Sequence, residues 1–103
     1  MFEDKKQYLN SYLLQESKIN RFNSMIEKNP QNRPIYIKEI ENAKTTREEI
    51  ENKIFAIDDE VLSELLFQKY ILGLNLEEVG YKINYSKRQT ERLHRKALEK
   101  FVM

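Results

Sequence analysis

The chain has 103 residues and a net charge of +1, and 34% of its residues are charged while 40% are hydrophobic, a balance typical of long amphipathic helices. The absence of cysteine excludes a disulfide or a thiolate metal site, and no apolar run approaches the length of about 18 residues that a membrane span requires. The N-terminus also lacks an apolar signal segment, so we expect a cytoplasmic protein without membrane contact.

Residues 3–28 are predicted to form the first helix. Gln15 occupies a position in its apolar stripe where a hydrophobic side chain would be expected. Asn29 and Pro30 should end the helix, because the residue before a proline is pushed out of the α conformation, and residues 31–34 should form a polar connector. The stripe consists of side chains that recur at helical spacing: Tyr8, Leu9, Tyr12, Leu13, Ile19, Phe22, Met25 and Ile26.

Residues 35–57 are predicted to form the second helix, with a pattern close to a seven-residue repeat. Either Ala43 or Lys44 fills its middle position, and Lys44 and Arg47 weaken it there. Two helices of similar length with a short link should fold back as an antiparallel, coiled-coil-like hairpin. The repeat comprises Ile37, Ile40, Ala43 or Lys44, Arg47, Ile50, Ile54 and Ile57.

We assign residues 1–57 to a hairpin domain with a role in packing and oligomerisation. A two-helix hairpin alone buries little apolar surface, so we expect it to pack against the rest of the chain and against a second copy, as a homo-oligomer. The tyrosines Tyr8, Tyr12 and Tyr36 should be half-buried with their hydroxyls in water.

A third helix is predicted over residues 59–72, and it is apolar over most of its circumference. The acidic residues 58–60 can cap its N-terminus, and Gly73 fits the position that ends it. Such a helix is buried on more than one side, so we place it between the hairpin and a C-terminal domain of residues 58–103.

Two capped helices are predicted to follow. Asn75 with Glu78 and Ser86 with Gln89 each form a capping-box pattern, in which two side chains satisfy two backbone amides reciprocally. Asn84 lies between the two helices, where a left-handed turn residue is needed. Two capped helices separated by about three residues are typical of a helix-turn-helix.

The last helix has one apolar side and one basic side. Thr90, Leu93, Ala97 and Phe101 share a face at 100° per residue, with Leu98 beside it, and the arginines face the other way. Residues 81–103 carry seven Lys or Arg and two Glu, a net charge of +5, whereas residues 1–80 carry eleven basic and fifteen acidic residues, a net charge of −4. A concentrated basic patch of this kind favours nucleic acid as the partner.

The segment from Asp59 to Phe101 resembles region 4 of sigma-70-type factors, the helix-turn-helix that reads a promoter element. Gly80 stands where that family usually has Ala, Asn84 where it has Gly, and Thr90 where it has Val. The hairpin before such a domain is similar to small phage transcription regulators of the ArpU and RinA type, which implies a phage or mobile-element protein and RNA polymerase as a further candidate partner. The matching positions are Leu76, Glu77, Glu78, Val79, Gly80, Asn84, Tyr85, Ser86, Thr90, Leu93, Ala97 and Leu98.

The functional prediction is therefore a sequence-specific transcription regulator that places the helix starting near Ser86 in the major groove of double-stranded DNA. Glu91 has two readings, as an acceptor for cytosine or as an ion-pair partner of Lys87, Arg88 or Arg95. The predicted base contacts are Lys87, Arg88, Gln89, Glu91 and Arg92. The predicted phosphate contacts are Lys82, Ser86, Arg95 and Lys96.

The alternative is a protein-interaction module that binds RNA polymerase or a regulator through its region 4-like domain or its hairpin. RNA binding is a weaker third reading, since no aromatic stacking platform lies on the basic face. We expect no catalysis, metal or cofactor, because the carboxylates are scattered and His94 is the single histidine. His94 is predicted at the buried edge of the last helix, in packing or in phosphate contact.

Overall fold

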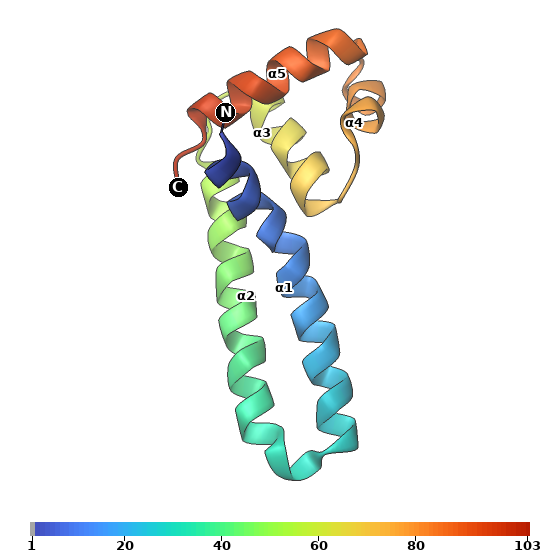
Figure 1. The fold of residues 1–103 in the computed structure, drawn as a ribbon. Helices are drawn as coiled ribbons and strands as arrows, with labels where there is room; N and C mark the ends of the chain where they lie inside the picture. The colour runs from blue at the N-terminus through green and yellow to red at the C-terminus, as the bar shows by residue number, and fades with distance from the viewer. Residues whose placement is uncertain (1) are drawn as a thin grey trace.

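The computed structural model describes residues 2–103, which contain five α-helices and no β-strand, as expected for an all-α protein (Figure 1). The molecule is elongated, with extents of 52 × 24 × 23 Å. None of the helices in the described part of the chain is both long and apolar enough to cross a membrane. The helices are α1 (Glu3–Lys28), α2 (Arg33–Phe55), α3 (Glu60–Leu66), α4 (Leu76–Ile83) and α5 (Lys87–Lys100).

Helices α1 and α2 run antiparallel side by side and form the long arm in Figure 1, joined by the 3-10 turn η1 (Pro30–Asn32). The predicted bounds of α1 are confirmed, but those of α2 are wrong by two residues at each end. Helix α2 begins at Arg33 because Pro34 lies in its first turn, where a proline's missing N–H is not needed. It ends at Phe55, so Ile57 lies outside the helix, and its side chain is buried.

The buried stripe of the arm differs from the predicted one at Leu13 and Tyr12, and it decides the alternative at Ala43 or Lys44. Leu13 is 41% exposed, so Leu9 rather than Leu13 carries that side of α1 into the core. Ala43 is buried and Lys44 is exposed, which decides between the two readings of the α2 repeat. Tyr12 is buried rather than half-buried, and its hydroxyl donates to Glu51 Oε1 at 2.6 Å instead of remaining in water.

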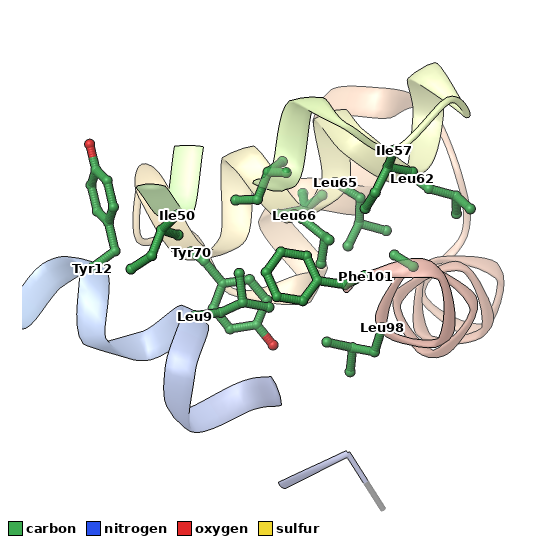
Figure 2. Packing of buried hydrophobic residues seen from close by; sticks show 13 residues of the cluster. Leu9, Tyr12, Ile50, Ile57, Leu62, Leu65, Leu66, Tyr70, Leu98 and Phe101 are labelled. Atoms are coloured by element: carbon green, nitrogen blue, oxygen red, sulfur yellow. The ribbon is translucent and has the colours of Figure 1, made fainter. Parts of the chain in front are cut away.

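One hydrophobic core joins the arm to the C-terminal helices. Leu9 and Ile50 from the arm pack in the same cluster as Leu65 and Phe101, and all four are fully buried (Figure 2). A second, smaller cluster of Ile19, Ile40 and Ala43 lies farther along the arm. The apolar residues of the predicted third helix therefore contact both the arm and the C-terminal helices in one core, at the end of the arm.

The predicted helix over residues 59–72 is divided. Asp59 caps α3 by accepting from Leu62 N at 3.1 Å, as its acidic start suggested, but the α-helical part ends at Leu66. A π-helical turn, η2 (Phe67–Ile71), follows, and it places Tyr70 in the core. Gly73 then adopts φ +77°, a left-handed conformation that glycine takes without a Cβ penalty.

Candidate nucleic-acid interface

Both capping boxes predicted around α4 and α5 are present. Asn75 Oδ1 accepts from Glu78 N at 2.8 Å while Glu78 Oε1 accepts from Asn75 N at 3.1 Å. Ser86 Oγ accepts from Gln89 N at 3.2 Å while Gln89 Oε1 accepts from Ser86 N at 3.1 Å. These bonds satisfy amides that a helix start leaves without partners, so both helices have sharply defined first turns.

The turn between α4 and α5 is held by Asn84, which has φ 64° and ψ 46° in the left-handed region. Tyr85 N then donates back to Gly80 O at 2.9 Å, which closes the end of α4. Gly80 also lies against α5, because a Cβ built on it would meet Thr90 Oγ1 at 2.5 Å. Residues 80 and 90 therefore fix how closely the two helices approach.

Helix α5 buries one side and exposes the other. Its buried residues are Thr90, His94, Ala97 and Leu98, in agreement with the predicted apolar face, and Leu93 is half-buried at the edge. In Figure 1, α5 crosses the end of the arm with its C-terminal part over α1 and its first turn beside α4. The predicted contact residues are all exposed: Lys82, Ser86, Lys87, Arg88, Gln89, Glu91, Arg92, Arg95 and Lys96.

The basic side chains of α5 have no acidic partner among the residues that the structure describes. Within residues 2–103, the ion pairs closer than 4.0 Å lie in or between α1 and α2, and none involves α5. Glu91 is consequently not paired with Lys87, Arg88 or Arg95. Arginines without partners keep all their donors available for a ligand, which favours the reading of this face as a binding surface.

Two of the predicted contact residues are partly occupied by the capping box. Gln89 uses its amide oxygen to accept from Ser86 N, so it retains only its Nε2 donor while the cap is closed. A bidentate contact with adenine needs both the oxygen and the nitrogen. Ser86 uses Oγ as an acceptor, and its hydroxyl proton remains available for a phosphate oxygen.

His94 is buried, and its Nε2 lies 2.7 Å from the Tyr70 hydroxyl. Burial, together with the nearby charges of Lys69 and Lys6, lowers the pKa of His94 to about 4. Burial also raises the pKa of Tyr70 to about 12, so both groups are neutral near pH 7. Of its two predicted roles, the structure gives His94 the packing one, as the polar link between α5 and η2.

Two lysines at the start of α1 approach α5, and sequence reasoning did not single them out. Lys5 Nζ donates to Leu98 O at 2.8 Å, at the end of α5 where carbonyl groups lack helical partners. Lys6 lines a groove together with Glu91 and Arg95. The only sequence signal was two basic residues in the first turns of a helix, where the helix dipole disfavours positive charge.

Comparison with protein-family models, with curated proteins and with solved structures finds no match to this chain. No cluster of three or more His, Cys, Asp or Glu side chains suited to a metal ion occurs within residues 2–103.

Proposed function

We propose that this protein is a sequence-specific double-stranded DNA-binding transcription regulator that inserts the first turns of α5 into the major groove. The observation that carries the proposal is a pair of capped helices, the second of which exposes Arg88, Arg92 and Arg95 with no acidic partner within residues 2–103. A rigid helix start with free guanidinium groups can donate paired hydrogen bonds to the O6 and N7 atoms of guanine.

In this proposal the residues near the start of α5 meet the bases. Arg88 and Arg92 donate to guanine, and unpaired Glu91 accepts from the N4 amino group of cytosine. Lys87 and the Nε2 donor of Gln89 complete the base-reading set. The second set of residues would hold the DNA backbone. Lys82, the Ser86 hydroxyl, Arg95 and Lys96 lie at the margins of the base-reading face, where they can neutralise or bind phosphates.

The remaining elements would position α5 on the DNA and join two copies of the chain. The α1–α2 arm would join two copies, so that two α5 helices read half-sites about 34 Å apart or a multiple of that distance. The resemblance to sigma region 4 adds RNA polymerase as a second partner, and the resemblance to phage regulators of the ArpU and RinA type adds a phage or mobile element as the origin of the chain. A cytoplasmic location follows from the same proposal.

The test is the DNA affinity of an Arg88→Ala/Arg92→Ala variant against duplexes enriched from a random pool. We expect at least a tenfold decrease in affinity, since each bidentate arginine–guanine pair contributes about 1–3 kcal/mol of discrimination. The matched control is Arg21→Ala/Arg33→Ala, which removes the same charge from exposed positions on the arm. Equal affinities of the two variants would overturn the groove-reading role of α5.

One observation favours a second candidate function, a protein-interaction module. Tyr81 on α4 is 90% exposed, and large exposed aromatic residues are enriched in protein interfaces. A regulator or an RNA polymerase subunit would then dock on α4. Retained DNA binding by a Tyr81→Ala variant, with loss of transcriptional output alone, would assign α4 to a protein partner and leave DNA reading to α5.

A further inference from the structure

A groove of about 460 Å³ lies between the first turns of α1, the start of α4 and the middle of α5. We call it the α1–α5 groove. Its apolar lining comes from Phe2, Leu76 and Leu98, and its polar lining from Lys6, Glu91, His94 and Arg95. It is the place where the arm and the proposed reading helix present charged groups to a common space.

The groove carries two cations that come from different helices. Arg95 is exposed and has no ion-pair partner within residues 2–103. Lys6 Nζ lies 3.9 Å from Glu3 Oε1, at the limit of an ion pair, and both side chains are substantially exposed to water. An exposed pair of this length contributes little, so the Lys6 ammonium can turn to a stronger anion at small cost.

The groove also borders the face of α5 that we assign to base contacts. Arg95 lies two turns after Arg88 on the exposed side of α5, and Lys6 stands across the groove from it. The preceding residue of α1, Lys5, is anchored to the end of α5 by its 2.8 Å bond to Leu98 O. Lys6 is therefore held beside α5 by a neighbouring contact.

We propose that the α1–α5 groove binds a backbone phosphate of the same duplex that α5 reads, with Lys6 and Arg95 donating to its oxygen atoms. This inference rests on the proposed function and extends the DNA contact from α5 to α1. Duplex strands flank a helix that lies in the major groove, so a cationic site beside α5 is where a phosphate would pass.

The experiment measures DNA affinity across a salt series for the full-length protein and three variants. Lys6→Gln removes the charge, Lys6→Arg keeps it, and Lys28→Gln makes the same charge change at the other end of α1. The slope of log K against log salt is negative, and for each phosphate that a variant no longer neutralises its magnitude should decrease by about 0.9. We expect this decrease for Lys6→Gln, but not for Lys6→Arg or Lys28→Gln.

The outcomes separate this inference from the proposed function. If the wild-type protein does not bind DNA, the proposed function fails and this inference fails with it. If Arg88→Ala/Arg92→Ala abolishes binding while Lys6→Gln keeps the wild-type slope, DNA reading stands and the groove phosphate is overturned.

A free phosphate ligand is the other source of the same chemistry. If the groove served such a ligand, inorganic phosphate would raise the melting temperature of the wild type above that in chloride of equal ionic strength. Lys6→Gln would abolish that rise and would keep the DNA salt slope, and this result would also overturn the proposal. Melting curves of every variant without ligand check that the substitutions leave the fold intact.

Discussion

At the scale of single residues, the buried pair of His94 and Tyr70 makes stability depend on pH. The pKa of His94 falls to about 4, first through burial and then through Lys69 and Lys6, whereas an unfolded histidine titrates near 6.5. Between these two values the unfolded state binds more protons than the folded state. The stabilisation by neutral His94 is therefore complete above pH 6.5 and is lost as the pH falls toward 4.

We predict that lowering the pH from 7.5 to 5 costs on the order of 1–2 kcal/mol through His94, after allowance for partial solvent screening. Urea unfolding at the two pH values measures it. A His94→Gln variant can still bond to Tyr70 but cannot titrate, so its stability should fall less over the same interval. Equal decreases in both proteins would assign the pH dependence to carboxylates alone.

Gly80 is a second residue whose substitution has a calculable effect. Alanine is favoured over glycine inside a helix by about 1 kcal/mol, so propensity alone predicts that Gly80→Ala stabilises the protein. The added Cβ would, however, meet Thr90 Oγ1 at 2.5 Å and Tyr85 O at 3.1 Å. Because Thr90 Oγ1 is also bonded to Ser86 O at 2.8 Å, it cannot easily turn away.

We therefore predict that Gly80→Ala lowers the free energy of unfolding by about 1 kcal/mol, the balance of overpacking against propensity. A Thr90→Ala substitution removes the clashing oxygen, so Gly80→Ala should be less harmful in that background. A double-mutant cycle of urea unfolding measures the coupling. Additive effects would mean that α4 and α5 shift apart without strain.

At the scale of elements, the start of α5 depends on its Ser86 cap. Replacing such a cap by alanine typically costs about 1 kcal/mol, and we predict this decrease in stability for Ser86→Ala in chemical unfolding. Ser24→Ala is the matched control, because Ser24 is exposed and its Oγ bonds to Asn20 O inside α1 rather than at a cap. The control should be nearly neutral, and a similar decrease in both variants would show that the cap contributes nothing specific.

The same elements show which parts of the fold local sequence can predict. Capping residues and Pro30 act on their immediate neighbours, so the bounds of α1 and the starts of α4 and α5 were predicted correctly. The π turn over residues 67–71 has no comparable local signal, and it coincides with the packing of Tyr70 against His94, 24 positions away. Helix α2 starts early because a first-turn proline fits a helix as well as a connector.

The candidate site likewise has one part that local sequence predicts and one part that only the fold creates. Periodicity at 100° per residue identified the exposed face of α5, because that face is a property of a single helix. It could not identify Lys5 or Lys6, since the bond from Lys5 to Leu98 joins residues 93 positions apart. Only the folded arrangement of α1 beside α5 brings Lys5 to the end of α5 and Lys6 to the α1–α5 groove.

At the scale of the whole molecule, Phe101 connects the arm to the C-terminal helices. It is fully buried among residues from α1, α2 and α3 (Figure 2). Its ring centroid lies 6.1 Å from that of Tyr8. Truncation of a buried phenylalanine to alanine costs about 3–5 kcal/mol, which is a large part of the stability of a domain of this size. We predict that Phe101→Ala melts far below the wild type, whereas Val102→Ala, at a 78% exposed position, melts close to it.

The proposed dimer is tested by mass and by DNA spacing together. The far part of the arm has only the small cluster around Ile19, while Leu14 and Ile35 expose 53% and 62% of their surface. A second copy would cover such side chains and remove them from water. We predict a mass near 25 kDa in sedimentation at micromolar concentration, twice the chain mass of 12.5 kDa, and a repeated half-site in selected DNA.

Leu14→Asp/Ile35→Asp should lower both the mass and the affinity for the repeat, whereas Leu72→Asp, at a 57% exposed position near the C-terminal helices, should change neither. A single-chain mass at every concentration, with an unrepeated site, would leave one α5 helix and the α1–α5 groove to supply all the affinity.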